Sequence, residues 1–324
     1  MVKAIRVKEC GGPEVLEWTE VDQPKPGPGE ALIRQKAIGL NFIDVYFRTG
    51  LYKAPMMPFS PGNEGAGDVL AVGDGVTDLK PGDRVAYAAT IGAYAEERVI
   101  PADRLVKIPD AISYETAAGM MLKGMTAQYL LRRTYKVKPG DTILFHAAAG
   151  GVGLIACQWA NHLGATVIGT VGSEEKAELA RAHGCHHTIN YRTENFVERV
   201  KEITGGAGCE VVYDSVGKDT FPGSLDCLKP LGLWALFGQS SGVVPPIDLG
   251  ILSQKGSLYV TRPTLFTYVA RREDLVATAN ELFDVVGKGI VKIEINQTYA
   301  LKDAAQAHRD LEGRKTTGTT VLLP

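Results

Sequence analysis

The feature that most constrains the fold is a cluster of glycines between an apolar run and a helical pattern. The stretch reads TILFHAAAGGVGLIACQWA, with glycines at 150, 151 and 153. From Val152 to Leu163, apolar residues recur at spacings of three and four, which predicts a helix. A strand, a glycine turn and a helix in this order are typical of the βαβ unit that binds dinucleotides.

The glycines of this turn have separate expected tasks. Ala147, Gly150 and Gly153 form the pattern A-x-x-G-x-x-G. We expect Gly150 and Gly151, with Val152 beside them, to let the backbone approach a pyrophosphate, and Gly153 to let the helix pack closely on the sheet. The helix N-terminus adds unpaired N–H groups and the positive end of its dipole. A glycine-rich turn without a ligand is the alternative, and the flanking strand and helix disfavour it.

Strands and helices alternate on both sides of this turn. Further apolar runs read ATVIGTV, TINY, CEVVYDSV, GLWALFG and SLYVT, with helical patterns between several of them. About six strands in such alternation predict an α/β domain with a doubly wound parallel (Rossmann) sheet.

The segments that flank this domain differ from it in composition and in their predicted secondary structure. Residues 1–122 are rich in Gly and Pro turns between short strands, which predicts a β-rich, barrel-like domain. After about residue 266 a helical pattern, KIEI, a second helical pattern and TTVLLP follow. We expect the last strand to lack a partner in its own segment and to return to the N-terminal domain. The predicted domains are therefore 1–122 plus 267–324, and 123–266 inserted between them.

Charge and composition exclude several classes of protein. The formal net charge is −2, so no basic field attracts nucleic acid. No run of about 18 apolar residues is present, and we expect no membrane partner. The five cysteines are scattered without a C-x-x-C pair, which favours a reducing, cytoplasmic location.

The end of the second strand separates NAD from NADP. NAD-binding proteins place an acidic residue there to hold the ribose 2′-hydroxyl. This chain has Val171, Gly172 and Ser173 at that place, and Lys176 adds a positive charge one turn later. A 2′-phosphate suits this set, so we predict NADPH as the cofactor. Tyr191, after the third strand, is placed to stack on the adenine.

The whole chain resembles the medium-chain dehydrogenase/reductases. The segments GGPEVL, KAIGLNFIDVYFRTGLY, FHAAAGGVGLIACQWA and VVYDSVG are similar to the zinc-free quinone reductase branch, which includes bacterial NADPH:quinone reductases and zeta-crystallin. The resemblance implies that the β-rich domain is GroES-like, that NADPH is the cofactor and that the protein is a homodimer.

Two asparagines stand where zinc-dependent relatives carry ligands. Those relatives have Cys in the segment that reads GLNFID here and His in the segment that reads GNE, and this chain has Asn41 and Asn63. An amide is a poor zinc ligand, so we expect no metal, although Glu64 is kept. The cluster at 185–187, Cys-His-His, is interpreted as a polar loop, since adjacent strand residues face opposite ways.

The resemblance also places the site. Asn41, Tyr46 and Tyr52 are the candidate catalytic residues, and the tyrosines offer aromatic faces and phenolic donors to a flat acceptor. Ordinary packing is the alternative role for both tyrosines. Further cofactor contacts are expected at Phe42, Ile43, Asp44, Val45, Tyr46, Thr126, Tyr129, Val216, Gly238, Gln239, Ser240, Ser241, Pro263, Thr264, Leu265 and Arg314.

Without a Lewis acid to stabilise an alkoxide, simple alcohols are poor candidate substrates. We expect NADPH-dependent reduction of a quinone. Reduction of the C=C bond of enals, enones or enoyl thioesters is the alternative within the same fold. A structural or RNA-binding role, as in some zeta-crystallin relatives, ranks lowest, because no basic patch with interleaved aromatic residues is present.

Overall fold

The computed structural model describes residues 1–324 and divides them into two compact units. The first unit comprises three segments, Met1–Met125, Val269–Gly287 and Ile293–Pro324. The second unit comprises Thr126–Tyr268 and Lys288–Lys292. In chain order, the second unit therefore interrupts the first.

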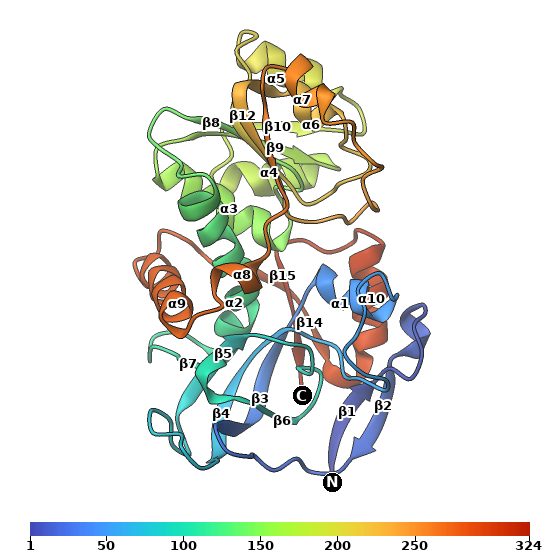
Figure 1. The fold of residues 1–324 in the computed structure, drawn as a ribbon, viewed down its shortest axis with the longest axis vertical. Helices are drawn as coiled ribbons and strands as arrows, with labels where there is room; N and C mark the ends of the chain where they lie inside the picture. The colour runs from blue at the N-terminus through green and yellow to red at the C-terminus, as the bar shows by residue number, and fades with distance from the viewer. The chain divides into compact units, whose positions relative to one another are not determined.

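The second unit is built on a six-stranded sheet in which every pairing is parallel, in the order β10-β9-β8-β11-β12-β13 (Figure 1). The order runs outward from β8 in both directions, so the doubly wound sheet predicted from the alternation is confirmed. The strands are β8 Thr142–Phe145, β9 Thr166–Val171, β10 His187–Asn190, β11 Cys209–Asp214, β12 Leu228–Leu236 and β13 Tyr259–Thr261.

The helices of this unit alternate with its strands. Helices α3 and α4 both pack against β9, and α6 packs against β11 and β12. Apolar residues of the strands, with Trp234 the largest, form the core under α5 and α6. The helices are α3 Gly151–His162, α4 Glu174–Ala182, α5 Phe196–Ile203, α6 Gly223–Asp226, α7 Gly250–Gln254 and α8 Leu265–Tyr268.

The first unit contains a seven-stranded sheet and a two-stranded sheet. Its longest strand, β3, pairs antiparallel with β4, β6 and β15 and so forms the centre of the larger sheet. The strands are β1 Val2–Arg6, β2 Glu17–Val21, β3 Glu30–Leu40, β4 Glu64–Val72, β5 Arg84–Ala88, β6 Glu97–Pro101, β7 Val106–Lys107, β14 Ile295–Ala300 and β15 Thr319–Leu323.

The last strand returns to the N-terminal part of the chain, as predicted, but it also has a partner in its own segment. β15 pairs antiparallel with β3 and parallel with β14. The expectation that it lacks a local partner was therefore wrong. The strand predicted at KIEI starts three residues later, at Ile295, and its parallel pairing needs the crossover that α10 provides.

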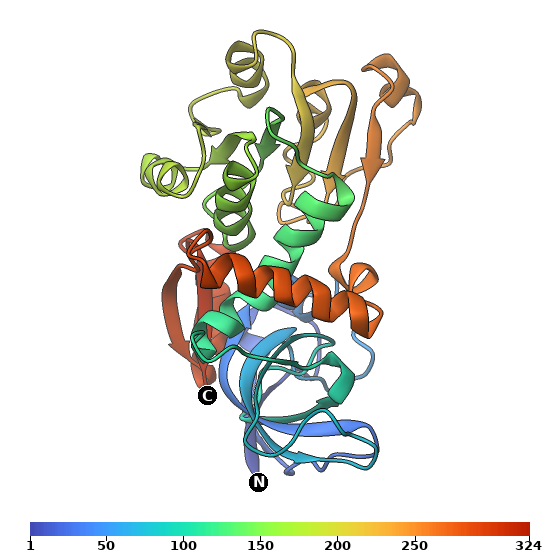
Figure 2. The ribbon, with the colours of Figure 1, turned by 90° about the vertical axis from the view of Figure 1, so that its left-hand side faces the viewer.

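Helices also occur within the segment that was expected to be β-rich. α1 is only seven residues long, which is too short for its periodicity to stand out. Figure 2 shows α9 crossing α2. Gly124 of α2 allows the close approach of Leu282 of α9, because a Cβ at position 124 would lie 2.5 Å from the Leu282 side chain. The helices are α1 Phe42–Arg48, α2 Tyr114–Tyr129, which enters the second unit after Met125, α9 Arg272–Gly287 and α10 Ala304–Glu312.

Candidate active site

The glycine turn after β8 presents the start of a helix without a side-chain cap. Gly150 is the N-cap of α3, and no side chain caps this helix end. Gly150, Gly151 and Val152 are half-buried, so their backbone is accessible. A Cβ at Gly153 would lie 2.5 Å from the carbonyl oxygens of Ala147 and Ala148, which explains why glycine is needed there. The uncapped N–H groups and the helix dipole form an anion site.

The turn after β9 carries no carboxylate at its apex. Ser173 caps α4, and its hydroxyl oxygen accepts the backbone N–H of Lys176 at 3.3 Å. A Cβ on Gly172 would lie 2.6 Å from the hydroxyl of Tyr191, so glycine lets that ring lie against the turn. The next acid, Glu174, pairs with Arg181 on α4. The predicted 2′-phosphate contacts at Gly172, Ser173 and Lys176 therefore lie together, with Tyr191 beside them.

A buried carboxylate organises the turn after β11. Asp214 Oδ1 accepts the backbone N–H groups of Val216 and Gly217 at 2.8 and 3.1 Å. Oδ2 accepts from the hydroxyls of Thr220 and Ser224 at 2.7 and 2.9 Å, and Trp234 Nε1 adds a third donor at 3.1 Å. Burial alone would raise the pKa of Asp214. The nearby His146 and these hydrogen bonds outweigh that effect and lower the pKa.

His146, directly after the neighbouring strand β8, completes this network. Its Nδ1 lies 3.0 Å from Thr170 Oγ1 and its Nε2 lies 3.1 Å from Ser224 Oγ. Burial lowers the pKa of His146, although Asp214 opposes the shift. These contacts give His146 a structural role in the turn. Asp214 was not among the predicted site residues, and its one signal in the sequence is an acidic residue at the end of an apolar strand.

The turns after β11 and β12 are joined to each other. The N–H groups of Ser240 and Ser241 bind the carbonyls of Ser215 and Val216, both at 3.0 Å. A Cβ at Gly238 would lie 2.7 Å from Ser215 O, so this glycine permits the close approach. The predicted contacts Val216, Gly238, Gln239, Ser240 and Ser241 thus lie at one edge with the glycine turn, because parallel strands end on the same side.

The remaining predicted contacts of the second unit lie near its chain entry and exit. Tyr129, at the end of α2, is buried and stacks on Tyr268 of α8 with ring centroids 4.4 Å apart. Thr126 precedes it by one turn and is also buried. Pro263, Thr264 and Leu265 lead from β13 into α8, with Pro263 and Leu265 buried and Thr264 exposed. Arg314 belongs to the first unit, where it lies exposed in the turn after α10.

In the first unit, Asn41 forms the start of α1. Its backbone N–H binds Asp44 Oδ2 at 2.9 Å, and its Nδ2 binds Glu64 Oε1 at 2.8 Å and Gly39 O at 3.3 Å. Glu64 also forms a buried ion pair with Lys123. The candidate catalytic Asn41 is therefore held from both sides.

A hydrogen-bonded chain runs from Asp44 toward the surface. The hydroxyl of Tyr94 donates to Asp44 Oδ2 at 3.0 Å and lies 3.1 Å from His308 Nε2. His308 Nδ1 lies 3.2 Å from Arg48 Nη1, and Arg48 binds Glu312 through two contacts of 2.8 Å. Arg48 only donates, so His308 Nδ1 accepts and Nε2 carries the hydrogen.

Burial decides the charges along this chain. It raises the pKa of Asp44 to about 7, with the nearby carboxylate of Glu64 adding to the effect. Burial, with a smaller contribution from the charge of Arg48, lowers the pKa of His308 to about 3. His308 is therefore neutral, and Asp44 titrates near neutral pH. The carboxylate of Asp44 is fully buried, so its side chain faces the core of this unit.

The candidate tyrosines lie within an aromatic cluster next to α1. The rings of Tyr46 and Tyr52 meet edge to face with centroids 5.1 Å apart, and Phe42 and Phe47 flank them. Tyr52 N–H binds Tyr46 O at 2.9 Å. Tyr46 is buried and Tyr52 is half-buried. Among their neighbours on α1, Val45 is buried, while Phe42 and Ile43 are half-buried.

The residues that first suggested a metal are placed in other contacts. Asn63 Nδ2 binds Ala89 O at 2.9 Å. Cys185 is buried, His186 Nδ1 accepts the N–H of Val167 at 3.0 Å, and His187 is exposed at the start of β10. No group of three or more His, Cys, Asp or Glu side chains is arranged to hold a metal ion.

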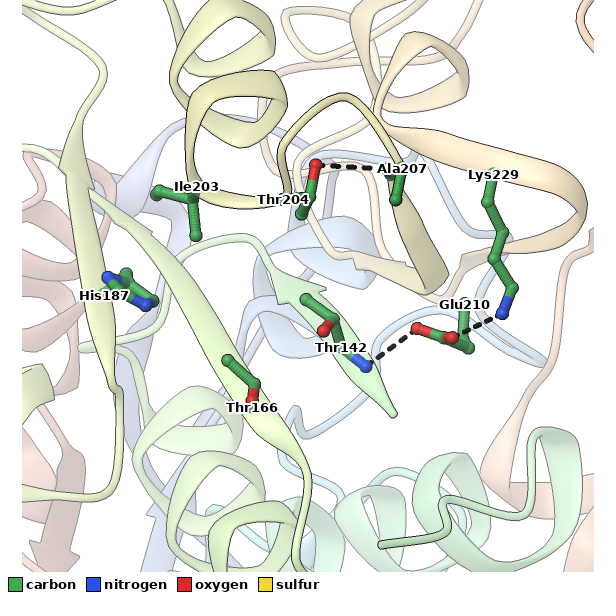
Figure 3. Close-up of a pocket in the computed structure, with 9 residues that line it drawn as sticks. Thr142, Thr166, His187, Ile203, Thr204, Ala207, Glu210 and Lys229 are labelled. Carbon is green, nitrogen blue, oxygen red and sulfur yellow. Dashed lines mark hydrogen bonds and ion pairs between the residues drawn. The ribbon is translucent and has the colours of Figure 1, made fainter. Parts of the chain in front are cut away.

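A cavity of about 390 Å³ lies at the amino ends of the strands of the parallel sheet (Figure 3). Thr142, Thr166 and His187, the first residues of β8, β9 and β10, line it together with the Glu210–Lys229 ion pair. Ligands of doubly wound sheets bind at the carboxyl ends of the strands. This cavity is therefore separate from the glycine turn.

No helix in the chain has the length and apolar character needed to cross a membrane.

Comparison with known proteins places this arrangement among characterised families. Residues 27–110 match the alcohol dehydrogenase GroES-like domain, and residues 151–283 match the zinc-binding dehydrogenase model. A quinone oxidoreductase from Pseudomonas aeruginosa is 58% identical over 100% of both chains. A 2-haloacrylate reductase from Burkholderia is 50% identical, covering 100% of this chain and 99% of its own. The structure of Escherichia coli quinone oxidoreductase complexed with NADPH is 53% identical and superposes with a TM-score of 0.98, covering 99% of this chain and 100% of its own.

Proposed function

This chain belongs to the quinone oxidoreductases of the medium-chain dehydrogenase/reductase family, and from that membership we propose that it reduces quinones with NADPH. One observation of the structure carries the proposal: the uncapped glycine turn of α3 lies at the same sheet edge as a β9 turn without a carboxylate. This edge suits a dinucleotide that bears a 2′-phosphate.

The chain's own groups would hold the cofactor in two parts. Backbone N–H groups at Gly150, Gly151 and Val152 would bind the pyrophosphate, since no side chain occupies that helix end. Ser173 and Lys176 would bind the 2′-phosphate. Arg314, which belongs to the first unit, is expected from family resemblance alone to approach the adenosine phosphate. NADPH, when bound, supplies a hydride. Val216 and the turn at 238–241 would border the nicotinamide end.

On the acceptor side, the aromatic cluster at α1 would position the substrate. Tyr46 and Tyr52 would orient a flat quinone by ring contact and hydrogen bonding. A quinone spreads added charge over its ring and oxygens, so its reduction needs orientation and a few donors. Asn41 and Asn63 are amides, which are poor zinc ligands, and a chelator is therefore expected to leave the rate unchanged.

Reduction of a conjugated C=C bond is the second candidate, and the 50% identity to a 2-haloacrylate reductase favours it. The test is NADPH oxidation measured with quinones, enals, enones and enoyl thioesters in parallel, with ethanol plus NADP as the control. Quinone-dependent oxidation without ethanol oxidation supports the proposal. Robust reduction of an enal or enoyl thioester without quinone activity would favour the second candidate.

We also propose a homodimer formed through β13. This strand is at one edge of the six-stranded sheet, and Tyr259 and Val260 are 62% and 42% exposed there. An exposed edge strand with apolar side chains can continue a sheet across a two-fold axis. Light scattering at micromolar concentration that gives a monomer mass would contradict the dimer.

The five free cysteines suit the reducing cytoplasm as the proposed location.

A further inference from the structure

The ammonium of Lys123 has more donors than the protein has acceptors for it. Lys123 is 5% exposed, and its Nζ makes an ion pair with Glu64 Oε1. A lysine ammonium carries three N–H donors, and the structure shows no second protein acceptor for this one. Leaving charged donors buried and unpartnered is costly, so the arrangement points to a ligand oxygen that completes the site.

Glu64 fixes this ammonium by a carboxylate that is fully engaged. Its Oε2 accepts the backbone N–H of Leu122 at 2.6 Å, and its Oε1 accepts from Asn41 Nδ2 at 2.8 Å as well as from Lys123. Gly39 lies against the carboxylate, and any Cβ at that position would overlap it. The negative charge of Glu64 is thus held on one side of the Lys123 ammonium, and the two remaining N–H donors point away from that carboxylate.

Asn41, in contrast, has no amide hydrogen left to give. Both donors of its Nδ2 are used, one by Glu64 Oε1 and the other by Gly39 O. The residue that family resemblance places at the reaction centre therefore cannot donate to a substrate oxygen without breaking a buried hydrogen bond. Lys123, by contrast, shares Glu64 Oε1 with Asn41 and has donors to spare.

We propose that Lys123 is a catalytic residue whose ammonium donates hydrogen bonds to the acceptor oxygen that becomes negative during reduction. The proposal rests on the function proposed above. The quinone takes up a hydride with its electron pair from the nicotinamide and becomes the hydroquinone monoanion. A proton from solvent then completes the hydroquinone. Lys123 keeps its own proton and stabilises the monoanion by charge and hydrogen bonding.

The test replaces the pair together, because removing Lys123 alone would leave the buried Glu64 charge uncompensated. In the double variant Lys123→Met/Glu64→Gln, both charges are gone. The matched control is Lys107→Met/Asp83→Asn, which removes a more exposed ion pair of the same unit. Melting temperature checks that both double variants are folded, and the NADPH dissociation constant, measured by protein fluorescence, should be similar in both.

Turnover should separate the two variants. We expect kcat with a benzoquinone to fall about a hundredfold in the Lys123 double variant and to stay unchanged in the control. Across quinones of decreasing reduction potential, the loss should grow, because a poorer acceptor stabilises its own charge less. A double variant that keeps the wild-type kcat, or one whose loss is the same for every quinone, would overturn the role of Lys123.

A binding measurement distinguishes failure of this inference from failure of the proposed function. The absorbance of 4-nitrophenol is titrated with pH in the presence of protein and NADP. A nearby ammonium should lower the pKa of the bound phenol in the wild type and the control, and the shift should vanish in the Lys123 double variant. If quinones are not reduced but this shift is present, the proposed function fails and the anion site stands. An unshifted phenol in the wild type would overturn the site itself.

Discussion

The two regions that carry the predicted site differ in the chemical groups that they contain. The cofactor edge of the second unit presents glycines, hydroxyls and backbone N–H groups, and its one deeply buried carboxylate, Asp214, is satisfied by five donors. The region around α1 contains instead a connected set of buried ionisable groups, including Asp44, Glu64 and Lys123. In the first region, the backbone N–H groups at the uncapped start of α3 are already in place for an anion. The second region keeps charges in a low dielectric, where protonation changes matter.

The largest expected effect tests whether Asp214 organises the cofactor edge. Asp214→Ala would leave two backbone N–H groups, two hydroxyls and an indole N–H without their acceptor. We expect the free energy of unfolding to fall by about 3–5 kcal/mol. Urea denaturation measures it, with Glu174→Ala, an exposed ion-pair residue, as the control. A loss no greater than that of the control would show that the carboxylate is dispensable.

A pH experiment tests the charged region. Asp44 in the folded chain binds a proton up to about pH 7, against an ordinary value of 3.8, because burial disfavours its charge. Its stabilising contribution is complete below about pH 4 and is lost as the pH rises through about 7. Between pH 5 and 8 the wild type should lose about 3 kcal/mol of unfolding free energy relative to Asp44→Asn.

The groups that face Asp44 are Asn41, Tyr94, Glu64 and Lys123. The control for this experiment is Asp83→Asn, since ion pairing with Lys107 lowers the pKa of Asp83 and leaves it ionised throughout this range. Parallel pH profiles for the wild type and Asp44→Asn would refute the raised pKa and weaken the contrast between the two regions.

Lys176 tests the selectivity of the cofactor edge. Lys176→Ala should weaken NADPH binding by about tenfold to a hundredfold and leave NADH nearly unaffected, because only NADPH has the 2′-phosphate. Isothermal titration with both nucleotides gives the answer. Equal dissociation constants for NADPH and NADH in the wild type would contradict the predicted preference.

The smallest expected effect concerns Tyr52. Tyr52→Phe removes the phenol and keeps the ring, which should cost a several-fold loss in kcat/KM for a quinone, about 1 kcal/mol. Tyr52→Ala also removes the ring contacts with Tyr46 and Phe47 and should lose more. If both variants match the wild type, these rings serve packing alone.

Sequence alone predicted the features that depend on short-range order. The glycine turn, each of the six parallel strands and the β9 turn without an acid are encoded in short stretches of sequence, where periodicity and glycine placement are visible. The return of the last strand to β3 was also predicted, but its pairing with β14 was not. That partner depends on a crossover whose geometry a local pattern does not describe.

Only the tertiary structure decided how the charged groups of the first unit are connected. Arg48 meets His308 across 260 residues of chain, and Lys123 meets Glu64 across 59. In the sequence, each of these residues has the appearance of an ordinary surface charge. Folding brings them together in a dry interior, where a charge must find a partner or change its protonation. Burial and the charged partners of these side chains set their chemistry, and neither can be inferred from any single residue of the sequence.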